Sequence, residues 1–310
     1  MRHLPRRPSR PWLIIAACAA TAVLALAALS AAPDATAKKK HKHNHKSQAP
    51  SLTFSDTGAA PDPTPLWGKI DCQNNSRVQQ INTGGDTHLT ALGAPQGDSA
   101  FRRLSVIDGD DVYGERCELG EDYRAEGPTV LYRQGKHRIT MLSVRLPPTF
   151  PLNVYTWQVV MQMKQTFPAA NSSGTPVLEL DAYNGRWVLR QSLSRGPVSD
   201  SRELWSAPSQ ANFWTRFAFD VRYSDNKKGY IRVGVDLNGD GDFADAGELS
   251  KGFHTYTLKT ETPGGDADGI KAGSAIPSHL RAGIYHDSAI PCRGPSGCQV
   301  DIDNVQVLRP

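Results

Sequence analysis

Residues 236–248 place oxygen-bearing side chains at alternate positions, which is the pattern of a calcium-binding loop. Gly241 stands where such a loop must turn sharply. The pattern departs from the helix–loop–helix calcium site, since Gly247 occupies the twelfth position and the flanking residues indicate strands. We therefore predict a hairpin loop that holds a structural Ca²⁺ ion; the alternative is a turn rich in Asp, Asn and Gly that needs no metal. The predicted ligands are Asp236, Asn238, Asp240, Asp242 and Glu248, with Asp245 as a further candidate.

Three short segments carry a second set of reactive side chains. Successive residues of a strand point to opposite sides of its sheet, so alternate residues share a face. One such face offers amides, cations, an imidazole and a phenol, an arrangement suited to a substrate groove; the alternative is the solvent side of an antiparallel sheet. The residues on this polar side are Gln158, Gln162 and Lys164 in residues 155–164, His279, Arg281 and Tyr285 in residues 279–285, and Arg116 and Glu118 in residues 115–118.

The same alternation predicts the residues that fill the core. Trp157 shares its side with Met161 and Met163, and Trp187 shares its side with Leu189, so we expect both tryptophans to be buried. Two further tryptophans, Trp205 and Trp214, remain candidates for stacking on sugar rings.

The elements that must position these residues are short strands. From about residue 67 onward, alternating segments are separated by clusters of Gly, Pro, Asn and Asp, with no long amphipathic helix. About 240 residues in such an array suit one large sandwich, so the predicted fold class is all-β. Example strands are residues 138–146, 154–165, 177–183, 186–191, 214–223, 230–237 and 279–285.

The cysteines indicate two disulfides. Cys292 and Cys298 flank a short turn-rich loop that can bring them together, which leaves Cys72 to pair with Cys117. A zinc site is the weaker alternative, because neither pair has metal-ligand spacing and no histidine is interleaved. Cys18 lies within the N-terminal apolar run.

The N-terminus has the pattern of a secretory signal. Four arginines precede an apolar run from Trp12 to about Ala32, and small residues end at Ala37, after which we expect cleavage. An uncleaved membrane anchor is the alternative, because the run is nearly long enough to span a bilayer. We expect a secreted protein with no membrane attachment after cleavage.

The domain boundaries follow from composition. We predict a signal peptide over residues 1–37, a basic, His-rich disordered linker over residues 38–65, and a β-sandwich over residues 66–310. The linker could adhere to an anionic wall or bind metal through its histidines, or it could be a solvated spacer.

The net charge of +4 does not describe the folded part. The chain has 35 Lys and Arg against 31 Asp and Glu, but the first 50 residues hold nine of the basic residues and one acidic residue. Residues 51–310 are therefore slightly acidic, with 26 basic against 30 acidic residues. Bulk charge gives little support to nucleic-acid binding, so we expect no nucleic-acid partner.

Motifs spread over about 190 residues resemble the polysaccharide-lyase family that contains glucuronan lyase and is related to heparin lyase and the alginate lyases. The resemblance implies a concanavalin A-like β-jelly-roll sandwich whose concave sheet binds an acidic polysaccharide, in a protein that we expect to be a monomer. The matching segments are residues 114–119, 127, 146–151, 157–162, 174–178, 184–186, 214, 223–224, 229–230, 280–285 and 303–305.

The resemblance also implies a reaction, which is β-elimination beside a uronic acid. The C5 proton is only weakly acidic, so a cation or amide must stabilise the charge that develops while a base removes the proton. By resemblance, Gln162 contacts the carboxylate with help from Arg116, and Tyr285 serves as base, acid or both. A phenol keeps its proton to about pH 10, and we expect Arg281 to supply the cationic field that Tyr285 needs.

One position departs from the family pattern. Family members commonly have histidine two residues after the glutamine, where this chain has Lys164. Lys164 could neutralise the substrate carboxylate and leave the proton abstraction to Tyr285, or the face could bind sugar without cleaving it. His279, on the same side as Tyr285, could also substitute as the base.

Residues 179–184 also resemble a strand of the retaining β-glucanases. Asn184 stands where those enzymes have a second glutamate, so the two-carboxylate mechanism lacks its acid/base partner. Glycoside hydrolysis is therefore the weaker interpretation.

Overall fold

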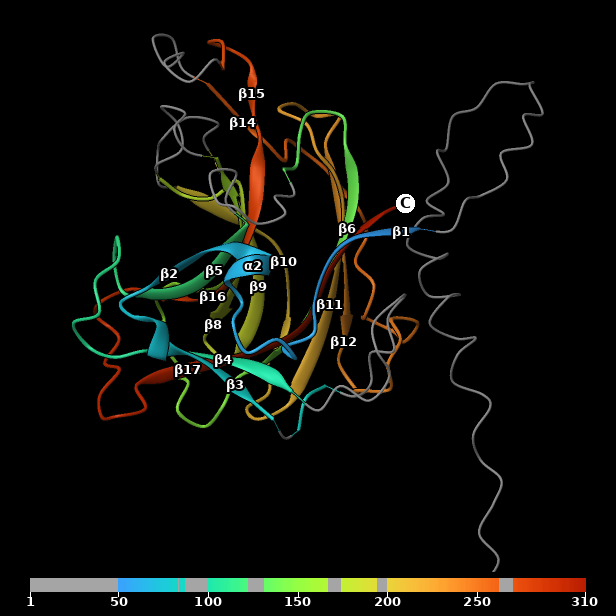
Figure 1. Cartoon of the computed structure of the whole chain (residues 1–310). Coiled ribbons are helices and arrows are strands. Elements are labelled where there is room, and N and C mark those ends of the chain that lie inside the picture. Colours follow the sequence, from blue (N-terminus) through green and yellow to red (C-terminus); the bar gives the residue numbers. More distant parts are fainter. Residues whose placement is uncertain are drawn as a thin grey trace, which may run out of the picture.

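The computed structural model describes residues 50–82, 84–86, 100–121, 131–166, 174–193, 200–261 and 270–310. Nearly all regular structure in these ranges is β, in two antiparallel sheets packed face to face, as expected from the sequence (Figure 1). No helix within these ranges is long and apolar enough to cross a membrane. The predicted signal peptide and the basic part of the linker, up to residue 49, lie outside the described residues.

The first sheet has eight strands in the order β13-β12-β11-β6-β17-β4-β3, with β1 also paired to β17. Its strands are β1 (Ser51–Asp56), β3 (Val78–Ile81), β4 (Phe101–Val106), β6 (His137–Arg145), β11 (Trp214–Arg222), β12 (Tyr230–Asp236), β13 (Phe253–His254) and β17 (Cys298–Arg309).

The second sheet has seven strands in the order β10-β9-β8-β7-β16-β5-β2. Its strands are β2 (Gly68–Cys72), β5 (Arg116–Glu121), β7 (Gln158–Gln165), β8 (Leu178–Tyr183), β9 (Arg186–Ser192), β10 (Ser201–Pro208) and β16 (Ser278–His286). The remaining elements are a separate pair of short strands, β14 (Lys259–Thr260) and β15 (Ala275–Ile276), the short helix α2 (Thr64–Trp67) and the 3₁₀ turn η1 (Asn75–Arg77).

The core lies between the two sheets and is built from alternate residues of each. Phe217 of the first sheet packs edge-to-face on Trp187 of the second, with ring centroids 5.1 Å apart. Both side chains are fully buried, so the prediction of a core Trp187 is confirmed. Because alternate residues face the core, the residues between them must face outward from the sandwich.

Two bulges reset this alternation in the strands of interest. The register shifts between Val159 and Met161 where β7 pairs with β8, and between Ala282 and Tyr285 where β7 pairs with β16. The second bulge lies beside Gly283, at which an added Cβ would lie 2.2 Å from the Cys117 carbonyl oxygen. Only glycine fits there, and the extra residue re-aims the side chains that follow it.

Both predicted disulfides are present. Cys72 joins the adjacent strands β2 and β5, and Cys292 joins Cys298 at the start of β17. These links hold the edge of the second sheet and a loop close to the first.

The predicted linker ends earlier than residue 65. Residues Ser51–Asp56 form β1, which pairs with β17, and Phe54 is buried in the core. The Asp56 carboxylate also accepts hydrogen bonds from Trp67 Nε1 and Arg102. This part of the linker prediction is wrong because a six-residue alternating strand lies inside a stretch of polar and small residues.

Candidate active site

The polar side chains predicted from three strands meet on the outer face of the seven-stranded sheet. Strand register brings Tyr285 beside Arg116, and Arg281 beside Gln162. The same register sets His279 beside Lys164, and Gly283 beside Glu118. We call this set of seven side chains the polar face: Arg116, Glu118, Gln162, Lys164, His279, Arg281 and Tyr285. The two cavities described for the molecule, of about 440 and 350 Å³, lie elsewhere.

Gln158 does not belong to the polar face. Its side chain is fully buried and donates hydrogen bonds to the carbonyl oxygens of Pro151 and Ala182. Trp157, predicted to be core, is instead 36% exposed and packs on Tyr285. Both predictions are wrong for one reason: the β7 bulge inserts a residue, which exchanges the two faces for everything that precedes it.

Glu118 lies at the centre of the polar face and connects its members. Its Oε1 accepts a hydrogen bond from Gln162 Nε2, while its Oε2 lies 3.3 Å from Arg116 Nη1 and 3.6 Å from Arg281 Nη1. The carboxylate is only 1% exposed. Glu118 was predicted to bind substrate, but this geometry makes it the residue that orients the groups around it.

Tyr285 lies between a cation and an aromatic ring. The Arg116 guanidinium carbon is 3.6 Å from the centroid of the tyrosine ring, and Trp157 packs edge-on at 4.6 Å. Gly114 covers the ring, since a Cβ there would lie 3.1 Å from Tyr285 Cε2. A cation against a phenol ring stabilises the negative charge that develops on the oxygen as the proton leaves.

Arg281 does not supply that field. Its Nη1 is 2.6 Å from Asp71 Oδ2 and its Nε donates to His279 Nε2 at 3.1 Å. Arg281 is thus engaged by Asp71 and His279, whereas the guanidinium that contacts the Tyr285 ring is that of Arg116. The sequence pointed to Arg281 on the same strand, but the register partner of Tyr285 is Arg116 on the neighbouring strand.

Lys164 is a half-buried cation among other cations. Its Nζ donates to the Gly174 carbonyl oxygen. Burial, with the nearby charges of Arg281, Lys259 and Arg116, lowers the pKa of Lys164 from 10.5 to about 7. Near neutral pH, this amine therefore exchanges its proton readily.

His279 is neutral and its basic nitrogen is occupied. The side chain is 4% exposed, and burial followed by the charges of Arg281, Lys69 and Lys164 holds its pKa well below 6.5. Because Nε2 accepts from Arg281, the proton must lie on Nδ1, which makes no hydrogen bond within the described residues. The geometry favours a residue that positions Arg281 over the substitute base considered above.

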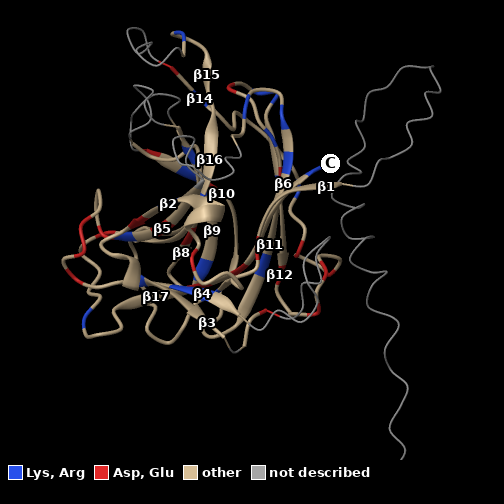
Figure 2. Cartoon of the chain, in the orientation of Figure 1, with Lys and Arg blue, Asp and Glu red and all other residues tan. Residues whose placement is uncertain are grey.

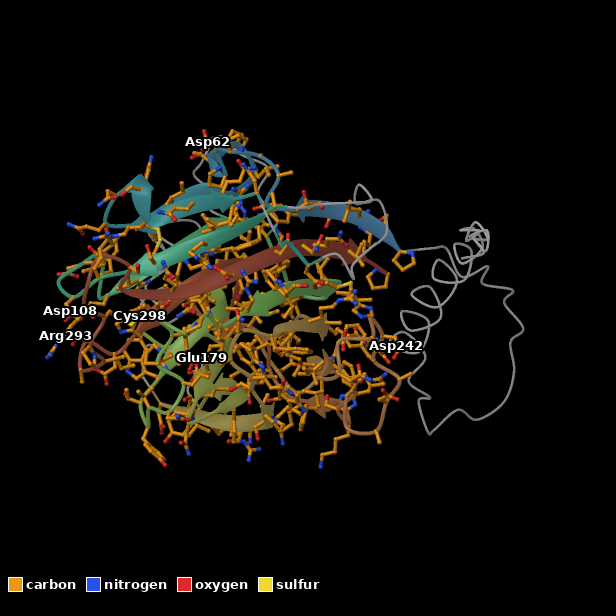
Figure 3. All side chains as sticks on the ribbon, turned by 90° about the horizontal axis from the view of Figure 1, so that it is seen from below. Asp62, Asp108, Glu179, Asp242, Arg293 and Cys298 are labelled. Atoms are coloured by element: carbon orange, nitrogen blue, oxygen red, sulfur yellow. A yellow bond between two sulfur atoms is a disulfide. The ribbon has the colours of Figure 1, made fainter. Side chains whose placement is uncertain are left out.

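Strand β8 adds two carboxyl groups beside the polar face. Glu179 pairs in register with Gln162, and Figure 3 labels it among the strands of the sheet. Burial and the neighbouring Asp181 raise the pKa of Glu179 to about 8, while burial raises that of Asp181 to about 6 against the opposing effect of Arg190, 2.7 Å away. A signal for this placement is present in the sequence, because the two carboxyl groups alternate with Leu178, Leu180 and Ala182, which are buried in the core.

Lys259 and Asp71 are residues of this region that sequence reasoning missed. Lys259 belongs to the separate strand β14 and is fully buried, and burial lowers its pKa to about 8 despite the opposing effect of Glu179. Asp71 lies on β2, beside Glu118 in register. No local pattern marks either residue, because their approach depends on how distant segments pack.

The acidic loop of residues 236–248 uses its oxygens to hold its own backbone. Asp236 accepts from the amides of Gly239 and Gly241, and Glu248 accepts from those of Leu237 and Asp245. In the described chain, the only three His, Cys, Asp or Glu ligand atoms found within 4.8 Å of one another belong to His286, Cys292 and Cys298, two of which form a disulfide. The carboxylates do not converge on one point here, and Ca²⁺ binding stays a prediction.

Comparisons with known proteins agree with this fold. A family model described as "Polysaccharide lyase" matches residues 61–305. The structure resembles that of an endo-β-1,4-glucuronan lyase from the fungus Trichoderma reesei, with a TM-score of 0.54 and 14% identity over 84% of this chain and 96% of that one. It also resembles an alginate lyase from Aplysia kurodai, with a TM-score of 0.54 and 10% identity over 84% of this chain and 100% of that one. No curated protein matches. At these identities the structural likeness shows the fold, which is the expected jelly-roll sandwich.

Proposed function

The chain belongs to the polysaccharide lyase family, and from this premise we propose that it cleaves a uronate-containing polysaccharide by β-elimination. The observation that carries the proposal is the placement of Tyr285 between Arg116 and Trp157, on the same sheet face as Gln162 and Lys164. We also propose that the protein acts outside the cell, because residues 1–37 have the pattern of an export signal.

Tyr285 is the proposed proton-transfer group. The Tyr285 phenolate, whose negative charge the Arg116 cation stabilises, takes the C5 proton. The electron pair left on C5 forms the C4–C5 double bond, and the C4–O bond breaks. The Tyr285 hydroxyl then gives its proton to the leaving oxygen, so that one chain becomes two and one of them carries an unsaturated end.

The substrate carboxylate needs partners that it can reach. Arg281, Lys164 and Tyr285 are partly exposed, whereas Arg116, Glu118 and Gln162 are at most 8% exposed. An approaching carboxylate favours the protonated form of Lys164, so substrate binding itself charges this amine. Glu118 holds the Gln162 amide through one carboxylate oxygen and lies close to Arg281 through the other.

A specific feature favours a second candidate function, which is carbohydrate binding without cleavage. Lys164 stands where family members commonly have histidine, and the imidazole of His279 has its basic nitrogen engaged by Arg281. If Arg116 does not activate Tyr285, the reaction lacks its proposed base.

Incubation of the protein with glucuronan, alginate and heparin-type polymers tests the proposal. We expect one of these polymers to give an unsaturated product, followed by its ultraviolet absorbance. Absence of product from all three, with binding retained, contradicts the lyase function and supports the binding protein. Release of reducing ends from a neutral glucan would instead indicate a glycoside hydrolase.

A further inference from the structure

The outer face of the eight-stranded sheet carries polar residues that the proposed reaction does not use. They lie side by side across five neighbouring strands, because register pairs each with the next. With strands about 4.8 Å apart, the row is about 19 Å long. We call it the cross-strand row, and it consists of Gln79, Arg103, Asp301, Arg145 and Trp214.

The row faces solvent on the side of the sandwich opposite the polar face. Leu104, Val144 and Val300 alternate with its members and are buried in the core between the sheets. The row therefore points away from the core, and the polar face points away from the core in the other direction. A ligand on the row cannot touch Tyr285.

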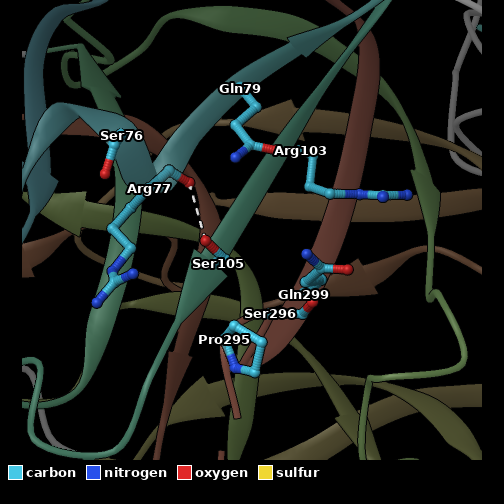
Figure 4. A pocket seen from close by; sticks show the side chains of 8 residues that line it. All are labelled: Ser76, Arg77, Gln79, Arg103, Ser105, Pro295, Ser296 and Gln299. Atoms are coloured by element: carbon cyan, nitrogen blue, oxygen red, sulfur yellow. Dashed lines mark hydrogen bonds between the residues drawn. The ribbon is translucent and has the colours of Figure 1, made fainter.

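A pocket of about 440 Å³ lies at the Gln79 end of the row (Figure 4). Its volume falls in the range of small-molecule sites, roughly 300–1,000 Å³. The walls offer the amides of Gln79 and Gln299, the guanidinium groups of Arg77 and Arg103, the hydroxyl of Ser296 and the ring of Pro295. None of the described residues that line this pocket is acidic.

The charges of this region are arranged with cations outside and carboxylates beneath. Arg103 and Arg145 both bind Asp301, which is fully buried, and Arg77 binds Asp110, which is 5% exposed. The three arginine side chains are 19–25% exposed. Three cations thus face two carboxylates, which leaves a positive surface.

Each arginine is oriented and still has a donor to offer. Arg77 binds Asp110 through Nε and Nη2. Arg103 and Arg145 bind Asp301 through the same two nitrogens. The Nη1 of each makes no hydrogen bond within the described residues. A guanidinium held in this way binds a further carboxylate at little entropic cost, because its side chain is already ordered.

Trp214 ends the row with an aromatic ring. It is partly exposed, and the Arg145 guanidinium lies 4.8 Å from its ring centroid. Aromatic faces beside amide and guanidinium donors suit sugars, which have both apolar ring faces and hydroxyl edges. The sequence singled out Trp214 for such stacking, and the polar face does not use it.

We propose that the cross-strand row and its pocket bind a second segment of an acidic polysaccharide, outside the face that cleaves it. The proposal rests on the proposed function for the identity of the polymer. Uronate carboxylates meet the free edges of the arginines, and sugar hydroxyls meet the glutamine amides. Such a second contact keeps a long chain attached while its other part is cleaved, which increases the effective concentration of cleavable bonds.

The test reverses the charge of the pocket without breaking its ion pairs. The variant Gln79→Glu/Gln299→Glu adds two carboxylates of the same size, and a glutamate at position 299 still accepts the hydrogen bond that Thr149 Oγ1 donates. Both variants carry Tyr285→Phe so that the polymer persists. The control is Gln210→Glu, which adds one carboxylate at an exposed glutamine outside the pocket, and each mobility is compared with that of the same variant in a gel without polymer.

Binding is measured by electrophoresis through gels that contain the polymer, with thermal unfolding to confirm that both variants fold. We expect the pocket variant to bind about tenfold more weakly than Tyr285→Phe alone, and the control to stay within twofold. Equal retention of the pocket variant and the control overturns the second site. Equally tight binding of the Tyr285→Phe protein to double-stranded DNA also overturns the second site, because it would show attraction for any polyanion. Failure of the wild type to cleave any uronate polymer overturns the proposed function separately, since it is measured without the gel.

Discussion

Both sheets carry charged residues on their outer faces, but the two faces differ in how these charges are placed relative to one another. On the eight-stranded sheet, Arg103 and Arg145 share the buried Asp301 at 2.7 to 2.9 Å. On the seven-stranded sheet, Lys164 is half-buried near three other cations, and Glu179 is buried beside Asp181. Basic and acidic residues are interspersed over the described chain, so the contrast lies in local placement rather than in net charge (Figure 2).

Under the proposed function, this difference distinguishes charged groups that stabilise the fold from charged groups that take part in the reaction. A buried charge with a good partner resists removal, whereas a buried charge among like charges costs folding free energy. Proteins keep such costly groups where a shifted pKa serves a reaction. The seven-stranded sheet is therefore the face on which we place catalysis, and the eight-stranded sheet is the face on which we place binding.

The largest expected effect is on the rate of cleavage. Tyr285→Phe removes the proton-transfer group and leaves the ring against Arg116 and Trp157. We expect a fall in kcat of about 10² to 10⁴-fold with little change in unfolding temperature. The control is Tyr155→Phe, because Tyr155 is 74% exposed. Full activity of the Tyr285 variant would break the assignment of chemistry to this face.

The second-largest expected effect is a loss of stability, which tests the ion pairs on the outer face of the eight-stranded sheet. Asp301→Asn leaves Arg103 and Arg145 without their common carboxylate. We expect a loss of about 3 kcal/mol in the free energy of unfolding, measured in urea, because a partly buried ion pair loses one side. A change below about 1 kcal/mol would mean that this pairing is no stronger than an exposed one.

Lys164→Met should have the opposite effect on stability. The pKa of Lys164 is about 7 in the folded protein and 10.5 when unfolded, so between these values the unfolded state binds more protons. Wild-type stability therefore falls as the pH is lowered from 10.5 to 7, and the full cost is present below pH 7. We expect the variant to lose activity, yet to unfold a few °C above the wild type near pH 6.

The pH dependence of this stability gain shows whether charge or packing causes it. The stability gain of Lys164→Met should shrink as the pH approaches 10, where lysine is neutral in both states. A constant difference at every pH would point to packing instead. The variant Lys164→Arg serves as the control, because it keeps the cation and should gain no stability at any pH.

The smallest expected effect is that of calcium. If the loop of residues 236–248 opens its carboxylates to an ion, excess Ca²⁺ stabilises the folded state by about 2 to 3 kcal/mol at a hundredfold excess over the dissociation constant. Unfolding temperatures in Ca²⁺ and in a chelator should differ by a few °C, and Asp240→Asn/Asp242→Asn should abolish the difference. Identical temperatures for the wild type would show that the loop needs no metal.

The strands of the sandwich could be predicted because alternation is a local property. Residues 138–146 and 279–285 were expected as strands and form β6 and β16. The local sequence predicts which face a residue lies on only while the alternation is unbroken. The bulge in β7 cannot be recognised from the sequence, and for this reason Gln158 and Trp157 were assigned to the wrong sides.

The partners of the site residues depend on register, which the sequence does not reveal. Arg281 was expected to serve Tyr285, but β5 brings Arg116 to that place and β2 brings Asp71 to Arg281. Lys259 reaches this region from β14, outside both main sheets. Such contacts between distant segments decide the charge state of the site.

The most direct test of the central claim is the origin of the oxygen in the products. The protein is incubated with the polymer that it cleaves in water enriched in ¹⁸O, and the new chain ends are weighed by mass spectrometry. Elimination breaks the C4–O bond without adding water, so we predict new non-reducing ends that are unsaturated, lighter than saturated ends by one water, and free of ¹⁸O; the new reducing ends are not compared, because their C1 oxygen exchanges with the solvent. Saturated new non-reducing ends would show hydrolysis and contradict the account.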